Sequence, residues 1–350
     1  MNDIIPAGLS GDALWLPVVF MMLMGFAILA YVVLDGYDLG VGLLMARARD
    51  DADKDVMVST IGPFWDANET WLVLGVGMLL IAFPLAHGVI MTALYLPVAL
   101  MLLGLILRGV AFDFRVKARD KHKSLWNRLF FAGSLLAAVT QGVMLGRVVT
   151  GFEPGLVNDV FCLGIGACLA SGYGLLGAGW LLIKTEGLLQ ARAVRWAQVC
   201  LVLTAVGVAA VSIATPIVSE RIFSKWFSLP NIFFLMPIPL FTGALFLACW
   251  LFLRRLERDA DEGNARGLER WCWAPFACTV GIFVLAFNGL AVSLFPYLVI
   301  DKMTIWDSAA ASESLWFVLV GTAIVLPAIL IYTVFVYRVF RGKTRALSYY

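Results

Sequence analysis

The stretch Leu34-Asp35-Gly36-Tyr37-Asp38-Leu39-Gly40-Val41-Gly42 decides how the rest of this chain is interpreted. It lies near the end of an apolar run that begins at about Leu14, and it places two carboxyl groups inside that run. A charged side chain within a membrane costs several kcal/mol, so such residues normally face the protein interior and have partners. Because Asp35 and Asp38 are one helical turn apart, we expect both to find polar partners on neighbouring segments.

Two later apolar segments carry polar residues that we expect at the same depth. The second segment opens with residues 62–71, in which Asp66 and Glu69 are three positions apart and share a helix face. The third holds Arg108 and Asp113 near its end. If the three helices alternate in direction, these groups lie within a few turns of one membrane surface. The sequence therefore predicts a single polar cluster.

Composition identifies an integral membrane protein. Of the 350 residues, 61% are hydrophobic and only 14% are charged, and the mean hydropathy is +0.90. The formal net charge of +2 is too small to indicate a polyanionic partner such as nucleic acid. We therefore expect the lipid bilayer, and not nucleic acid, as the surroundings of this chain.

The apolar segments predict an all-α fold in which residues 1–350 form a single polytopic membrane domain. A helix needs about 20 apolar residues to cross a bilayer. On this rule, we predict nine transmembrane helices, at about 14–45, 57–83, 89–112, 126–149, 159–183, 196–218, 230–253, 271–296 and 314–337.

The distribution of Lys and Arg predicts the orientation. One set of alternate connections carries most of them, within residues 47–54, 115–128, 184–195, 254–270 and 338–345. The opposite set holds only Arg147, Arg221, Lys225 and Lys302. Because cytoplasmic loops are enriched in Lys and Arg, we expect the N-terminus outside and the C-terminus in the cytoplasm.

The chain offers few ligands for a metal or a haem. Its only histidines, His87 and His122, fall in a predicted outer loop and a predicted cytoplasmic loop. The six cysteines lie in or beside apolar segments without CxxC spacing, and we interpret them as packing residues. We therefore predict no metal site in this chain, and we expect any redox centre in another subunit.

The acidic residues support two interpretations. The first is a hydrated path that passes protons inward from the cytoplasm, and its candidate relay groups are Asp66, Asp38 and Glu69. The second is a neutral structural network that ties the three helices together. Under either interpretation, the structural and electrostatic partners are Asp35, Arg108 and Asp113. Five carboxyl groups against one arginine leave an excess of acid, which favours the proton path because buried charge must be protonated or hydrated.

Two tryptophans flank the acidic pair of the second segment. Trp65 and Trp71 could wall a quinone or the proton path, or they could be interface anchors, as most tryptophans near span ends are. We keep both as candidates for a quinone pocket.

Together, these segments resemble subunit II of the cytochrome bd-type quinol oxidases. The resemblance runs the length of the chain and rests on residues 35–42, 63–72, 108–115, 184–187, 295–296 and 305–310 in this order. The compact chain is also compatible with the cyanide-insensitive branch of that family.

The resemblance implies a fold and a partner. The fold is nine transmembrane helices, arranged as two four-helix units plus one extra helix, in the bacterial cytoplasmic (inner) membrane. The partner is subunit I, which carries haem b and haem d. The complex is a respiratory-chain oxidoreductase that transfers electrons from quinol to dioxygen and forms water.

For this chain, the resemblance implies a subunit that ligates no haem, supports subunit I and contributes a cytoplasmic proton path. Asp66 matches the family acid at the mouth of that path. Other functional or assembly positions are matched by Asp38, Trp65, Arg108 and Asp113. A bound quinone and a small single-helix subunit occur in some members, and the sequence leaves both open.

Two other classes of function remain. A proton-coupled secondary transporter would also use carboxyl groups within the membrane and Gly-rich helices. A purely structural scaffold for subunit I would need the polar cluster for assembly alone.

Overall fold

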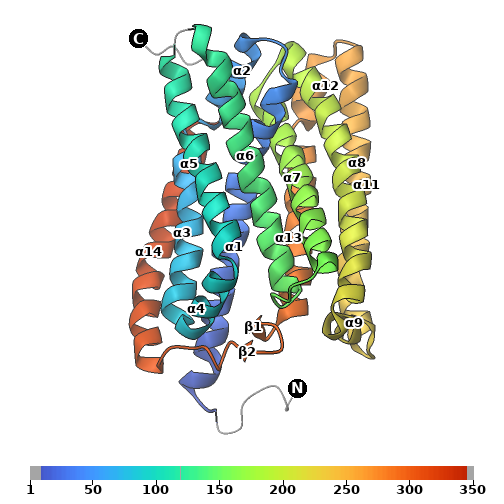
Figure 1. The fold of residues 1–350 in the computed structure, drawn as a ribbon. Coiled ribbons are helices and arrows are strands. Elements are labelled where there is room, and N and C mark those ends of the chain that lie inside the picture. Colours follow the sequence, from blue (N-terminus) through green and yellow to red (C-terminus); the bar gives the residue numbers. More distant parts are fainter. Residues whose placement is uncertain (1–8, 119, 345–350) are drawn as a thin grey trace.

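The structure is a computed structural model that describes residues 9–118 and 120–344. It is a bundle of long helices that lie side by side (Figure 1). The elements are α1 (Asp12–Leu44), η1 (Met45–Arg47), α2 (Asp51–Ile61), α3 (Trp65–Ala82), α4 (Pro84–Ala93), α5 (Tyr95–Lys117), α6 (Asp120–Val149), α7 (Leu156–Lys184), α8 (Gly187–Val218), α9 (Glu220–Phe227), α10 (Asn231–Leu235), α11 (Pro237–Asp261), α12 (Ala265–Trp271), α13 (Ala274–Leu294), β1 (Tyr297–Val299), β2 (Met303–Thr304) and α14 (Ser312–Val339). The two strands form one antiparallel pair at one end of the bundle.

The predicted all-helical membrane fold is confirmed, but the count of nine crossings is not. Within the described residues, 8 helices are long and apolar enough to cross a membrane. The helix α3 is not one of them, because its 18 residues begin with a polar turn that contains Asp66, Asn68 and Glu69. The nine-helix count and the two four-helix units therefore stay predictions.

Two predicted spans are each divided into two helices. The segment predicted at 57–83 is split between α2 and α3, and the break lies at Gly62-Pro63-Phe64, where proline cannot continue the backbone hydrogen bonds of a helix. The segment predicted at 89–112 is split between α4 and α5 at Leu94.

The predicted loop positions of the two histidines are also wrong. His87 lies within α4, whose first turn accommodates Pro84. His122 lies in the first turn of α6. Both helices begin before the predicted spans, α4 at Pro84 and α6 at Asp120. Residues outside an apolar run can therefore still be helical.

The centre of the bundle is the contact between α1 and α7. Residues Asp35–Gly42 of α1 are all buried, and so are residues 172–182 of α7. A Cβ atom on Gly40 would overlap the backbone carbonyl of Tyr173, and one on Gly177 would overlap the backbone of Gly40. The glycines of these two stretches therefore allow the two helix backbones to touch.

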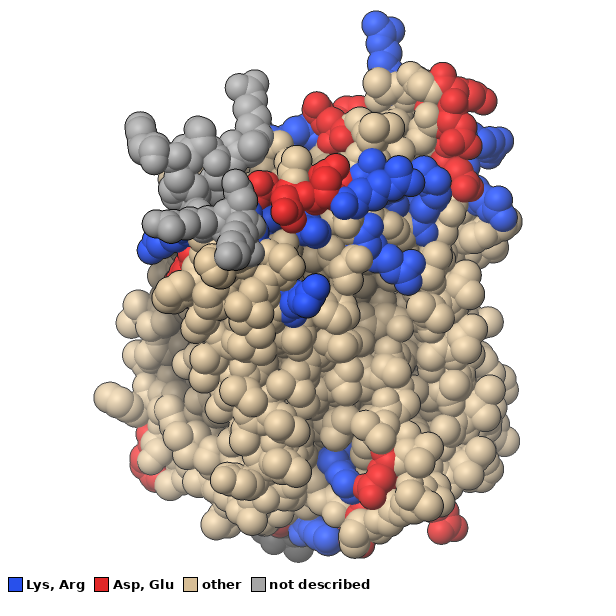
Figure 2. Space-filling view, turned by 45° about the horizontal axis from the view of Figure 1, so that its top comes forward, with Lys and Arg blue, Asp and Glu red and all other residues tan. Residues whose placement is uncertain are grey.

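Charge is strongly asymmetric on the surface. Figure 2 shows most of the visible Lys, Arg, Asp and Glu gathered at one end of the bundle and a smaller number at the opposite end, with sides between them that carry almost no charge on the face that is drawn. Comparison with Figure 1 identifies this end as the one that carries α2 and α12. Of the predicted basic set, Arg119 and Arg345 lie outside the described residues. The remainder agrees with a bundle that has one strongly polar membrane surface.

Candidate functional site

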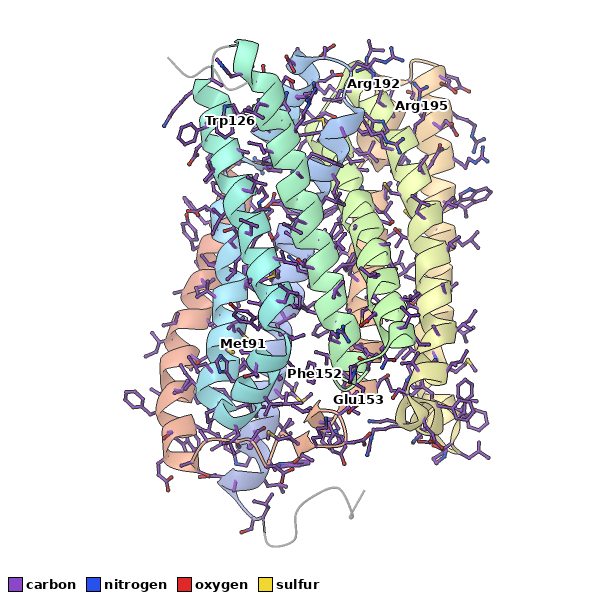
Figure 3. All side chains as sticks on the ribbon, in the orientation of Figure 1. Met91, Trp126, Phe152, Glu153, Arg192 and Arg195 are labelled. Atoms are coloured by element: carbon purple, nitrogen blue, oxygen red, sulfur yellow. The ribbon has the colours of Figure 1, made fainter. Side chains whose placement is uncertain are left out.

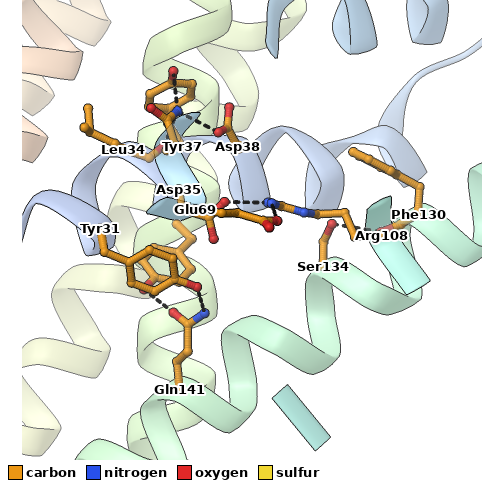
Figure 4. Close-up of polar contacts among 12 residues, drawn as sticks. Tyr31, Leu34, Asp35, Tyr37, Asp38, Glu69, Arg108, Phe130, Ser134 and Gln141 are labelled. Atoms are coloured by element: carbon orange, nitrogen blue, oxygen red, sulfur yellow. Dashed lines mark hydrogen bonds and ion pairs between the residues drawn. The ribbon is translucent and has the colours of Figure 1, made fainter. Parts of the chain in front are cut away.

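A buried arginine holds three helices together. Arg108 of α5 is 1% exposed, and its Nη1 donates to Oδ1 of Asp35 of α1 at 2.7 Å. Its Nη2 pairs with the carboxylate of Glu69 of α3, which is 29% exposed (Figure 4). One guanidinium therefore bridges two carboxylates, a geometry that its planar array of donors permits.

The second buried aspartate of α1, Asp38, has no positively charged partner of its own among the described residues. Asp38 is fully buried, and its Oδ2 accepts a hydrogen bond from Nδ2 of Asn68 at 2.8 Å. Nδ2 of Asn68 also lies 2.9 Å from the hydroxyl of Tyr37, which in turn lies 2.6 Å from the hydroxyl of Tyr337 of α14. Asp38 thus lies among neutral polar groups.

Several polar atoms of the cluster lack a partner. Oδ2 of Asp35, Oδ1 of Asp38 and Nε of Arg108 are buried and have no hydrogen-bond partner within residues 9–118 and 120–344. With all three acids ionised, Asp35, Asp38 and Glu69 would outweigh the single arginine. Unsatisfied polar atoms and excess charge are both costly in a protein interior. The arrangement can therefore take up a proton or hold water.

A second polar group extends the site toward the middle of the bundle, and sequence reasoning missed it. Nε2 of Gln141 donates to the hydroxyl of Tyr31 at 2.7 Å, and the hydroxyl of Tyr173 donates to Oε1 of Gln141 at 2.6 Å (Figure 4). Tyr31 is one helical turn before Asp35 on α1. The signal that could have found this group is Gln141, a polar residue deep inside the apolar segment 126–149.

We predicted that all the acidic residues of the first three apolar segments would join one polar cluster. This prediction is wrong for Asp66 and Asp113. Asp66 and Asp113 are both exposed and have no partner in the described part of the chain. The buried side of α3 is marked by Asn68, Trp71 and Gly75. Because Asp66 precedes Asn68 by two residues, it lies about 200° around the helix from it. Glu69 lies between these directions, so it reaches Arg108 and remains partly exposed.

The two candidate tryptophans occupy different surroundings. Trp65 packs against Phe112 with ring centroids 5.1 Å apart, and its ring lies 5.9 Å from the guanidinium carbon of Arg108. Trp71 is 2% exposed and meets Phe26 edge to face at 5.7 Å. Trp65 therefore belongs to the polar site, whereas Trp71 belongs to the apolar core.

Replacing Asn68 by leucine tests the surroundings of Asp38. Among the described residues, the change removes the only hydrogen-bond donor to a fully buried carboxyl group, so we expect a loss of about 1–3 kcal/mol of stability. Thermal unfolding of the purified protein measures it. The matched control is Asn288→Leu, because Asn288 is exposed and its side chain bonds only within its own helix. Equal midpoints for both variants would contradict this account of Asp38.

Comparison with known proteins identifies the family. The family model described as "Cytochrome bd terminal oxidase subunit II" matches residues 16–340. The chain belongs to this family. It is therefore a subunit of a cytochrome bd-type quinol oxidase complex and a multi-pass membrane protein, as the sequence predicted.

Relatives in several bacteria match nearly the whole chain. The "Cytochrome bd ubiquinol oxidase subunit 2" of Bacillus subtilis (strain 168) is 27% identical over 94% of this chain and 96% of its own. The "Cytochrome bd-I ubiquinol oxidase subunit 2" of Escherichia coli (strain K12) is 24% identical over 91% of this chain and 92% of its own.

The fold also matches a solved structure. A chain of "The structure of bd oxidase from Geobacillus thermodenitrificans" superimposes with a TM-score of 0.70 at 15% identity, and the match covers 93% of this chain and 98% of that one. At this identity, the match supports the fold alone. The helical architecture of the subunit is therefore that of a bd oxidase chain.

Within the described residues, no group of three or more His, Cys, Asp or Glu side chains could hold a metal ion. His87 and His122 lie near opposite ends of α5, a helix of 23 residues that is about 35 Å long. The two histidines are too far apart to ligate one haem between them.

Proposed function

We propose that this subunit supports a haem-bearing subunit I and supplies a proton path from the cytoplasm for the reduction of dioxygen to water. The observation that carries the proposal is the buried excess of acid around Arg108, with unpartnered oxygens on Asp35 and Asp38. A cluster built for structure alone has no need of more carboxyl groups than its arginine can pair with.

The acidic residues of α3 connect this cluster to the surface. Asp66 is exposed in the first turn of α3, and Glu69 lies one turn further on and is 29% exposed. Asp38 is fully buried. Exposure thus decreases from Asp66 to Glu69 to Asp38, the order in which a proton taken from the cytoplasm would meet these groups. Asp35 is held in an ion pair by Arg108. We therefore assign Asp35 a structural role beside the path and not a role as a proton carrier.

The electron-transfer groups belong to the partner in this proposal. The positions of His87 and His122 support placing haem b and haem d in subunit I, since these two histidines lie in different helices, α4 and α6, and do not share one site. The names of the relatives indicate ubiquinol as the electron donor of their complexes. We extend a quinol donor to the complex that contains this chain.

We further infer nine crossings, with α3 as the ninth span. The start of α1 and the end of α14 lie at opposite ends of the bundle, which requires an odd number of crossings (Figure 1). The gathering of Lys and Arg at the end that carries α2 and α12 supports placing that end in the cytoplasm of a bacterial inner membrane.

The replacement Asp66→Asn tests the path. We expect the assembled oxidase to keep its haem absorbance and to lose turnover about a hundredfold or more, because a relay carboxyl is replaced by a group that cannot carry a proton. Oxygen consumption with a quinol donor, expressed per haem, is the measurement. The matched control is Asp261→Asn, which removes an exposed carboxyl at the end of α11 and should leave turnover unchanged.

A structural scaffold is the competing function, and the link that Arg108 makes among α1, α3 and α5 favours it. The same experiment separates the two. If Asp66→Asn reduced the amount of assembled complex while turnover per haem stayed normal, the scaffold would be the better account.

A further inference from the structure

Two arginines converge on one tryptophan at the polar end of the bundle, away from the site around Arg108. The guanidinium carbon of Arg255 of α11 lies 5.3 Å from the ring centre of Trp271, and that of Arg270 of α12 lies 5.5 Å from it. Trp271 is held in place by stacking on Phe252 of α11, with centroids 5.4 Å apart. A cation near an indole ring is favourably placed, so Trp271 orients both guanidinium groups.

Neither arginine has a carboxylate partner within the described residues, and both are exposed. Two neighbouring acids, Glu269 and Glu257, are engaged elsewhere. Oε2 of Glu269 pairs with Nζ of Lys343 at 2.8 Å, and Oε2 of Glu257 accepts a hydrogen bond from α8 at 2.8 Å. Two oriented guanidinium groups thus present their donors to the outside, and residues 9–118 and 120–344 supply no carboxylate to accept from them.

The surface next to this pair of arginines is apolar and faces outward. Leu251 and Leu247 precede Arg255 by four and eight residues, so the three lie in one row along α11. They are 53% and 58% exposed, respectively. Trp250, which precedes Leu251, is 42% exposed, and Trp273, two residues after Trp271, is 52% exposed. Exposed tryptophans near the ends of membrane helices mark the level of the lipid headgroups.

Other arginines lie at the same end of the bundle, and one of them, Arg192, is paired with Asp53. The guanidinium carbon of Arg254 lies 5.4 Å from the ring centre of Trp250. Figure 3 shows Arg192 and Arg195 at the same end of the bundle, near the top of α8. Arginine side chains that rest on aromatic rings at the edge of an apolar surface can keep their charge at headgroup level.

We propose that Arg255, Arg270 and Trp271 form a binding site for the phosphate of an anionic phospholipid in the adjacent leaflet. The guanidinium groups donate hydrogen bonds to the phosphate oxygens, a pairing that arginine makes with paired donors. An acyl chain lies along the row of Leu247 and Leu251. This inference does not rest on the proposed proton path, because the two sites share no residue.

Native mass spectrometry of the whole oxidase tests the proposal. The complex is purified in mild detergent and transferred to nanodiscs that contain phosphatidylglycerol or phosphatidylcholine. The variant carries Arg255→Gln and Arg270→Gln. The control carries Arg258→Gln and Arg266→Gln, two exposed arginines of the same two helices, α11 and α12. We expect parent and control to retain phosphatidylglycerol and the variant to lose affinity about thirtyfold, since each arginine contributes about fivefold.

Three results would overturn the lipid site: equal retention of phosphatidylglycerol by variant and parent, equal retention of phosphatidylcholine by the parent, or displacement of the lipid by millimolar inorganic phosphate. The last would indicate a site for soluble phosphate. Haem absorbance per protein reports whether the variant assembles. If the double variant does not assemble, Arg270→Gln alone serves as the test, with an expected loss of about fivefold.

Discussion

Replacement of Arg108 by glutamine is expected to prevent the subunit from assembling into a stable oxidase. The change leaves Asp35 buried without its counter-charge and removes the partner of Glu69. Removing one member of a buried ion pair costs about 3–5 kcal/mol. Since a folded protein is stable by only about 5–15 kcal/mol in total, we expect the yield of assembled complex to fall severely. Size-exclusion chromatography with haem absorbance measures that yield.

Two further variants separate charge from geometry at this position. Arg108→Lys keeps the charge but cannot donate in parallel to two carboxylates, so its yield should lie between parent and Arg108→Gln. Adding Asp35→Asn to Arg108→Gln should recover part of the yield, because the buried charge is then removed as well. The matched control, Arg195→Gln, changes an exposed arginine and should assemble normally. Normal assembly of Arg108→Gln would contradict the ion-paired arrangement.

The sequence predicted the centre of this site because charged residues are conspicuous in apolar segments. Asp35, Asp38 and Arg108 interrupt such segments, and burial of each could be inferred from its cost in lipid alone. The three are indeed buried in the structure, and two of them form an ion pair. Membrane segments thus reveal their polar interior more readily than soluble cores do.

The placement of Asp66 could not be predicted in the same way. Its spacing from Glu69 indicated a shared helix face but gave no information on which face of α3 is buried. That direction is set by Asn68 and Trp71, which pack toward α1 and the core. Glu69 lies close enough to the buried side of α3 to pair with Arg108. Asp66 lies further around the helix and is exposed. The spacing of residues within one helix therefore cannot predict which of them are buried unless the neighbouring helix is also known.

The hydrogen bonds among Tyr31, Gln141 and Tyr173 were missed for a different reason. Tyrosine is compatible with a transmembrane segment without a polar partner, and a single glutamine within 126–149 does not change the hydropathy of that segment decisively. The three residues come from α1, α6 and α7. Only the packing of these helices brings them together, and this packing depends on glycine contacts whose partners the sequence does not name.

Those contacts lead to the second large effect: Gly40→Ala is expected to disrupt the bundle. The added methyl group would overlap the backbone carbonyl oxygen of Tyr173, and a backbone atom cannot move aside without displacing its helix. The separation of α1 from α7 should cost about 3 kcal/mol or more, the upper end for overpacked interiors. The thermal midpoint and the yield of assembled complex are the measurements.

Gly164→Ala is the matched control, because a methyl group at that exposed position of α7 meets nothing within 4 Å. Alanine is the better helix former by about 1 kcal/mol, so this variant should be as stable as the parent or more stable. Gly177→Ala should behave like Gly40→Ala, since its methyl group would overlap the backbone of Gly40. Because both changes remove the same helix contact, their effects should not add. Equal midpoints for Gly40→Ala and Gly164→Ala would contradict the close approach of α1 and α7, and with it the position of Asp35 and Asp38 relative to Arg108.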